Sequence, residues 1–249
     1  MCVPPRRLTL TPMMIAFKLA LWIHVLAGAV ALSVFWLPLV TKKGGVAHRR
    51  VGWVYVVAAG TIALTAFLNC ARMLTDANPA NDRPGIFLAY IGVLAWASAQ
   101  LGVRALRTKR RTTASRSPID LVPAALLVAG GLALGAFALH EGIVLFGIFA
   151  ALGVTLGTAH LRFWLRPPVT RTAWFLAHMT GMGGSCIATV TAFLVVNAHR
   201  FGFGPYDLVV WLAPGFLGGI GLTLWKRYYE RRFARGTSSP TPRNAVLAR

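Results

Sequence analysis

The stretch LVPAALLVAGGLALGAFAL (residues 121–139) is followed, after His140 and Glu141, by GIVLFGIFAALGVTLGTAHL (residues 142–161). Each is long enough to cross about 30 Å of hydrocarbon as a helix rising about 1.5 Å per residue. Backbone amides in lipid need partners within the protein, and neither stretch shows the apolar-polar alternation of a barrel strand. This part of the sequence therefore predicts two successive transmembrane helices.

Five further apolar stretches lie on either side of this pair, at residues 13–39, 51–71, 86–106, 172–197 and 206–225. The chain of 249 residues is 56% hydrophobic and 13% charged, too little polar surface for a soluble globule. The predicted fold class is all-α, an integral membrane bundle of seven transmembrane helices. Its expected domains are a disordered leader at 1–12, the transmembrane domain at 13–228 and a disordered basic tail at 229–249.

The 26 Lys and Arg residues give a net charge of +20, and they lie mainly in short runs between the apolar stretches. Alternate loops carry 20 of them on one side and 6 on the other, which predicts an external N-terminus and a cytoplasmic C-terminus. Because the charges belong to loops, nucleic acid is excluded as a partner. The expected partners are the lipid bilayer and anionic lipid at the cytoplasmic face. An excess of Arg over Lys, with many Ala and Gly, indicates the cytoplasmic (inner) membrane of a bacterium as the location of this multi-pass protein.

Small residues, acids and prolines add local predictions. Glycine pairs four residues apart predict close helix packing at Gly131 and Gly135, Gly153 and Gly157, and Gly215 and Gly219. Asp120 and Asp207 begin apolar stretches and are expected to cap helix N-termini. Pro38 and Pro214 predict kinks.

Six histidines are the residues best able to carry chemistry. The seventh span has no Lys for a retinal Schiff base, which argues against a rhodopsin-type pump. The three cysteines have no zinc-binding spacing, so no protein-only metal site is expected. His24 and His178 lie well inside apolar stretches, where a polar ring needs a partner: either a cofactor or a hydrogen bond to a neighbouring helix.

The predicted topology sorts the histidines by depth. His24, His140 and His199 form an outer group, and His48, His160 and His178 form an inner group. This distribution would suit two bis-histidine b-type haems, although members of each group differ in depth by about two helical turns. We predict His24, His178, His48 and His160 as cofactor-binding residues, with haem b as the candidate cofactor. Arg49 and Arg50 would pair with haem propionates or act as a stop signal at the membrane boundary.

Three motifs carry a resemblance to a known family: WIHVLAGAVAL with His24, the run from Gly45 to Tyr55 that contains His48, and AHMTGMGGSCIATVTAFLVVN with His178. Together they resemble a bacterial family of polytopic membrane proteins defined as a domain of unknown function, which brings no activity with it. A looser similarity, of histidines on several helices, is to the cytochrome b561 group of electron carriers. The chain lacks that group's paired-histidine helices at matched depth.

Two functions follow from these patterns. The first is an electron carrier that binds haem b or another redox centre through buried histidines. The second is a non-catalytic small-molecule permease, sensor or membrane assembly partner, in which the histidines only form hydrogen bonds. No pattern assigns a catalytic reaction or catalytic residues.

Overall fold

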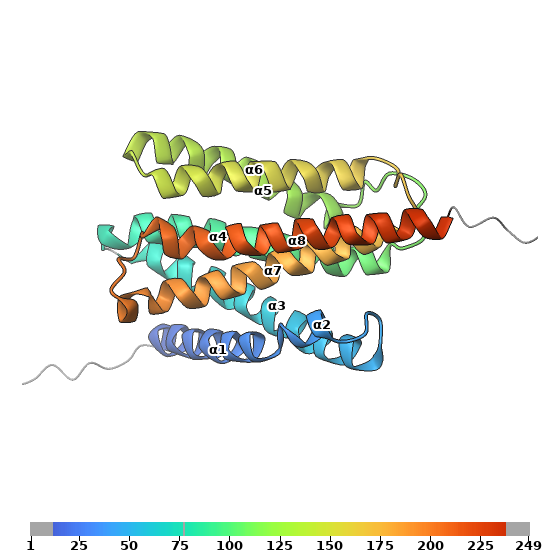
Figure 1. The fold of residues 1–249 in the computed structure, drawn as a ribbon. Helices are drawn as coiled ribbons and strands as arrows, with labels where there is room; N and C mark the ends of the chain where they lie inside the picture. Colours follow the sequence, from blue (N-terminus) through green and yellow to red (C-terminus); the bar gives the residue numbers. More distant parts are fainter. Residues whose placement is uncertain (1–11, 77, 238–249) are drawn as a thin grey trace, which may run out of the picture.

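The structure, a computed structural model, describes residues 12–76 and 78–237 (Figure 1). Its helices are α1 (Pro12–Val34), α2 (Leu37–Val40), α3 (Val46–Thr75), α4 (Asp82–Arg107), α5 (Pro118–Glu141), α6 (Val144–Leu165), α7 (Ala173–Asn197) and α8 (Leu208–Thr237). Short 3-10 helices, η1 (Pro79–Asn81) and η2 (Ala198–Phe201), precede α4 and follow α7. These described ranges contain no strand.

Seven helical segments of the described chain are long and apolar enough to cross a membrane, so the predicted all-α bundle is confirmed. The described chain begins at one end of the bundle and finishes at the other, as an odd number of spans requires (Figure 1). Which end faces the cytoplasm stays a prediction.

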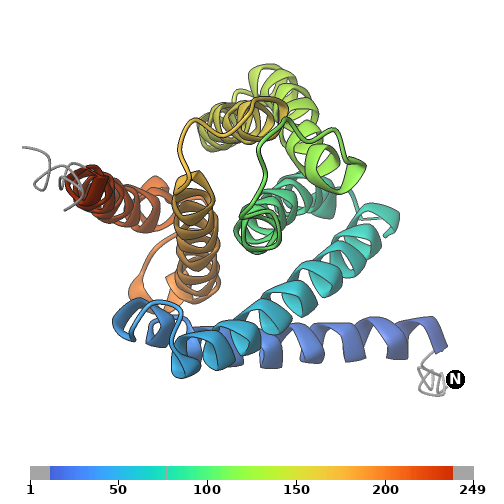
Figure 2. The ribbon, with the colours of Figure 1, turned by 90° about the vertical axis from the view of Figure 1, so that its right-hand side faces the viewer.

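The central helix of the bundle is α4. It packs against α7 on one side, α5 on another and α3 on a third, while α5 and α6 form the closest helix pair. Seen along the bundle, α1 and α3 lie side by side at one edge, and α8 lies at the outside against α7 (Figure 2). Apolar side chains remain exposed over α1 and α8, as expected where lipid replaces water as the solvent.

The main core lies where α4, α6 and α8 begin. The Phe87 and Phe146 rings stack with centroids 4.2 Å apart, and the Trp211 ring lies 5.0 Å from that of Phe87. The Trp211 indole also donates to Pro205 O at 2.9 Å, so its polar atom is satisfied. Aromatic rings thus join three helices at the end of the bundle predicted to be external.

Glycines allow the close contact of α5 with α6. A Cβ on Gly157 would lie 2.8 Å from Leu127 Cβ and 2.9 Å from Ala124 O. Gly153 borders the hydroxyl of Tyr90 on α4, which donates to Leu127 O on α5 at 3.0 Å. The predicted packing role of Gly153 and Gly157 is therefore confirmed.

The corresponding prediction for α8 is wrong. A Cβ added to Gly215 or Gly219 would meet no heavy atom within 4 Å, whereas one on Gly218 would lie 2.5 Å from Ile187 on α7. Glycine spacing identifies a helix with small residues, but the rotation of the helix about its axis decides which glycine meets a neighbour.

Asp120 does not cap α5 as predicted. Ser117 occupies the cap position, and the fully buried Asp120 carboxylate accepts from Arg104 Nε at 2.6 Å and from the Ser115 hydroxyl at 2.7 Å. Asp207 does stand directly before α8, but its carboxylate accepts from Gly204 N, upstream of the helix. The ion pair between Asp120 and Arg104 joins α5 to α4. The position of Asp120 in the sequence does not reveal this tertiary contact.

Two segments differ from the sequence analysis in length. The first span breaks between α1 and α2, because the Pro38 ring would clash with the carbonyl of Val34, where α1 ends. Pro214, in contrast, leaves α8 continuous. Residues 229–237, expected in the disordered tail, continue α8, whose Tyr229 ring packs 4.8 Å from Phe175 on α7. The expected leader, apart from Pro12, and residues 238–249 lie outside the described residues.

Candidate cofactor site between α3 and α7

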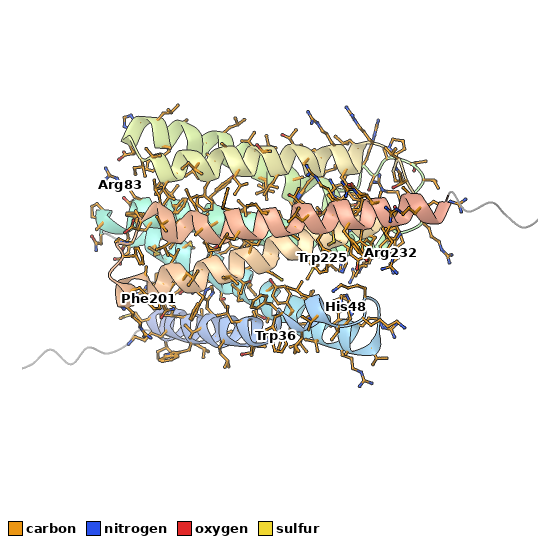
Figure 3. All side chains as sticks on the ribbon, in the orientation of Figure 1. Trp36, His48, Arg83, Phe201, Trp225 and Arg232 are labelled. Carbon is orange, nitrogen blue, oxygen red and sulfur yellow. The ribbon has the colours of Figure 1, made fainter. Side chains whose placement is uncertain are left out.

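His48 lies in the first turn of α3, near α2 (Figure 3), and a hydrogen bond to the segment that precedes α3 orients its ring. The short helix α2 leaves its last carbonyls without helical partners. Pro38 O takes two donors, His48 Nδ1 at 3.1 Å and Lys43 Nζ at 2.8 Å. The intervening turn needs Gly44 at φ +75°, a left-handed conformation that favours glycine.

His178 is oriented by the close approach of α7 to α4. Its Nδ1 lies 2.9 Å from Gly102 O. This carbonyl is reachable because Gly181, one turn further along α7, lies against Gly102: a Cβ on Gly181 would be 2.6 Å from Gly102 N. A helical carbonyl oxygen already accepts one hydrogen bond from its own helix, and its second lone pair accepts a hydrogen bond from the imidazole.

The two imidazoles meet between α3 and α7. Their centroids are 6.3 Å apart, and the ring planes make an angle of 67°. In each ring Nδ1 faces a backbone carbonyl, to which only a protonated nitrogen can donate, so Nε2 carries the free lone pair. Histidines that bind metals are held in this way, with the second ring nitrogen donating to a carbonyl or carboxylate.

The centroid separation of the rings has the length expected of two imidazoles that bind one metal ion. A metal-nitrogen bond is about 2.0–2.1 Å long, and ring atoms lie about 1.1–1.2 Å from the centre of an imidazole, given bonds of about 1.33 Å. Two imidazoles on opposite sides of one ion therefore have centroids a little over 6 Å apart, close to the observed 6.3 Å.

No group of three or more His, Cys, Asp or Glu side chains in the described part of the chain could hold a metal ion. Two nitrogens are too few for the four-coordinate site that zinc prefers. A haem would need only two ligands from the protein, because the porphyrin would supply the rest. Among common metal centres, the donor set fits a haem best.

Two ammonium groups lie near the pair. Lys43 Nζ lies 4.6 Å from the centroid of the Trp225 ring, and burial lowers the pKa of its ammonium group. Lys109 interacts electrostatically with His178, and its Nζ lies 4.6 Å from the Trp174 ring centroid. Aromatic rings thus hold two ammonium groups near the histidines. Such charges would complement the propionates of a haem.

A cluster of hydroxyl groups lies deeper along the same two helices. The Tyr55 hydroxyl is 2.9 Å from Ser185 Oγ and 3.1 Å from Thr189 Oγ1, with Cys186 packed beside it. Thr189 donates to Ser185 O, so its oxygen accepts from Tyr55, which leaves Tyr55 to accept from Ser185. All three hydroxyl groups therefore have hydrogen-bond partners, and the cluster links α3 to α7.

The sequence places Tyr55 on the face of His48, and Ser185 and Thr189 on the face of His178. The structure shows that these two faces meet. Tyr55 follows His48 by seven residues and Ser185 follows His178 by seven, and α3 and α7 both run from the same end of the bundle. Equal spacing on two parallel helices is the signal that could have paired them from sequence.

The other histidines lie elsewhere. His24 on α1 bonds Thr65 Oγ1 at 2.9 Å. Thr65 follows His48 by 17 residues on α3, about 26 Å at 1.5 Å per residue, so His24 cannot share a centre with His178. His160 is buried on α6, which packs mainly on α5. Within the described residues, ring contacts among histidines pair only His48 with His178.

Two of the four predicted cofactor residues thus come together, His48 and His178. The outer group is dispersed: His24 lies on α1, His140 on α5 and His199 in η2. The described residues therefore hold one bis-histidine pair, where the depth argument allowed two. Depth along the membrane normal says nothing about the lateral position of each helix in the bundle, and that position decided the pairing.

No protein-family model, curated protein or solved structure matches this chain.

Proposed function

We propose that this protein is an electron carrier of a bacterial cytoplasmic membrane, in which His48 and His178 hold one b-type haem. The observation that carries the proposal is the pairing of the two imidazoles, 6.3 Å apart, with Nδ1 of each facing a backbone carbonyl. The looser similarity to the cytochrome b561 group would agree with it, but the proposal depends on the geometry alone.

The helix arrangement also supports a group between α3 and α7. The backbones of α3 and α7 approach each other closely at very few positions, whereas those of α4 and α7 pack closely. Long side chains, rather than close backbones, bridge α3 and α7. An interface of this kind accommodates a planar cofactor with less rearrangement than a glycine-lined one.

A bound haem would supply a one-electron couple within the membrane. The protein's own residues perform three tasks. His48 and His178 would present Nε2 as ligands, the carbonyls of Pro38 and Gly102 fix the tautomer and orientation of the rings, and nearby ammonium groups would balance propionate charge.

The test is an absorption spectrum of the detergent-purified protein, expressed with added haem, before and after dithionite reduction. The wild type should show a Soret band, split visible bands after reduction and about one haem per chain. His48→Ala and His178→Ala should each lose most of this signal, while the control variants His24→Ala and His160→Ala should keep it.

Two results would overturn the proposal. One is a folded, monodisperse wild type that shows no Soret band. The other is a haem spectrum that persists unchanged in both His48→Ala and His178→Ala. Either result would favour the permease, sensor or assembly function, in which the histidines only bind neighbouring helices.

The membrane orientation is tested separately. Reporter fusions after Arg110 should give a cytoplasmic signal and fusions after Gly202 an external one, because alternate loops carry 20 and 6 positive charges. This orientation would place the histidine pair near the cytoplasmic surface. A cytoplasmic signal at Gly202 would reverse it.

A further inference from the structure

A groove runs between α1 and α3 on the outside of the bundle, away from the histidine pair. Its volume is about 530 Å³. The α1 wall includes Leu26 and Val30, and the α3 wall includes Arg50, Trp53, Val57 and Thr61. Apart from Arg50 and Thr61, all the residues that line it are apolar, so its occupant must be largely apolar.

The length of the groove matches half of a membrane. Arg50 and Thr61 are eleven residues apart on α3, about 16 Å at 1.5 Å per residue. The hydrocarbon core of a bilayer is about 30 Å thick, so one leaflet accounts for about 15 Å. A groove that begins at Arg50 therefore extends about as far as one acyl chain in one leaflet.

The charge of the groove is entirely positive. Among the described residues, Arg50 is the one charged residue that lines it, and no carboxylate does. In the same part of the chain, the structure gives the Arg50 guanidinium group neither an ion pair nor a hydrogen-bond partner. Arg50 follows His48 by two residues, about 200° around the helix, so it points away from the candidate cofactor site. A cation without a partner beside an apolar channel complements an anionic headgroup.

We propose that this groove binds one anionic phospholipid, with an acyl chain between α1 and α3 and the phosphate on Arg50. Trp53 lines the groove one turn along α3 from Arg50, so a phosphate on Arg50 would put its indole at the depth where such rings contact headgroups and acyl chains together. A zwitterionic lipid has the same acyl chains, but its headgroup carries no net charge. The site therefore selects headgroup charge, and it does not depend on a bound haem.

Native mass spectrometry of the delipidated protein in detergent tests the proposal, with phosphatidylglycerol and phosphatidylcholine of identical chains as probes. The wild type should bind one phosphatidylglycerol several-fold more tightly than phosphatidylcholine. Arg50→Gln should lower phosphatidylglycerol affinity about fivefold. Arg171→Gln removes the same charge from an exposed loop at the same end of the bundle and should change affinity little.

A second variant tests the apolar part of the groove. Val57 is 65% exposed, so Val57→Trp should fill the groove without disturbing the core, and it should lower the binding of both lipids. Equal affinity of the wild type for the two lipids would overturn the proposal. So would equal losses in Arg50→Gln and Arg171→Gln, which would show attraction to general surface charge instead of a site.

Discussion

The α5–α6 interface and the α3–α7 interface are built in opposite ways. Between α5 and α6, glycines bring the backbones together, and Gly157 leaves no room for a Cβ. Between α3 and α7, the backbones stay apart and polar side chains span the distance, with Tyr55 bonded to Ser185 and His48 beside His178. Closely packed backbones leave no space for a ligand. Polar side chains that bridge two separated backbones can instead exchange some of their mutual contacts for contacts with a ligand.

This contrast has a physical basis in lipid. No hydrophobic force drives helices together there, so association depends on van der Waals packing of small residues or on hydrogen bonds between helices. The α5–α6 pair relies on the first and the α3–α7 pair on the second. We therefore expect substitutions that add volume to be most harmful at α5–α6, and substitutions that remove polar groups to act at α3–α7.

The largest loss of stability is expected from a substitution at Gly157. Gly157→Leu should destabilise the protein by about 3 kcal/mol, since its side chain would overlap Leu127 and the backbone of α5. The measurement is thermal unfolding in detergent. Gly219→Leu is the matched control, because a Cβ there meets open space. Equal melting temperatures for the two variants would contradict the packing difference between α5–α6 and the outer face of α8.

The next effect concerns the contact of α4 with α7 that orients His178. Gly181→Ala should cost about 2 kcal/mol, because its Cβ would lie 2.6 Å from Gly102 N. It should also weaken haem binding, since Gly102 O would move away from His178 Nδ1. Gly184→Ala is the control, because its Cβ would lie 3.5 Å from Ser98 Oγ, an ordinary contact. Thermal unfolding and haem content should be measured for both variants. Identical results for the two would refute the idea that the contact of Gly181 with Gly102 orients His178.

A smaller effect is expected from the hydroxyl cluster. Tyr55→Phe should cost about 1 kcal/mol, because one hydrogen bond between transmembrane helices contributes about 0.6 kcal/mol on average and this hydroxyl makes two. A double-mutant cycle with Ser185→Ala, read by unfolding in detergent, isolates the direct bond. A coupling energy of zero would show that the two hydroxyls do not interact.

The smallest effect is expected at His24. His24→Leu removes the bond to Thr65 and should cost about 0.6 kcal/mol, with no change in any haem spectrum. Thr65→Val should have a similar cost, because it removes the other half of the same bond. A spectral change in His24→Leu would place His24 at a cofactor, contrary to its separation from His178.

Sequence by itself determined the span count and the faces of the helices. Apolar length predicts seven crossings because backbone groups in lipid must be satisfied within the chain, whatever the neighbours are. Helical periodicity likewise places Tyr55 on the face of His48, and Ser185 on the face of His178. These are local properties, so they can be derived before any packing is known.

Only the tertiary structure decided which faces meet. It paired His48 with His178 and left His24 with Thr65 and His160 on α6. It also joined Asp120 to Arg104, where sequence position suggested a helix cap. The physical reason is that periodicity fixes side chains relative to their own helix axis, while the order and rotation of helices in the bundle depend on contacts between residues far apart in the chain, such as Gly102 with Gly181.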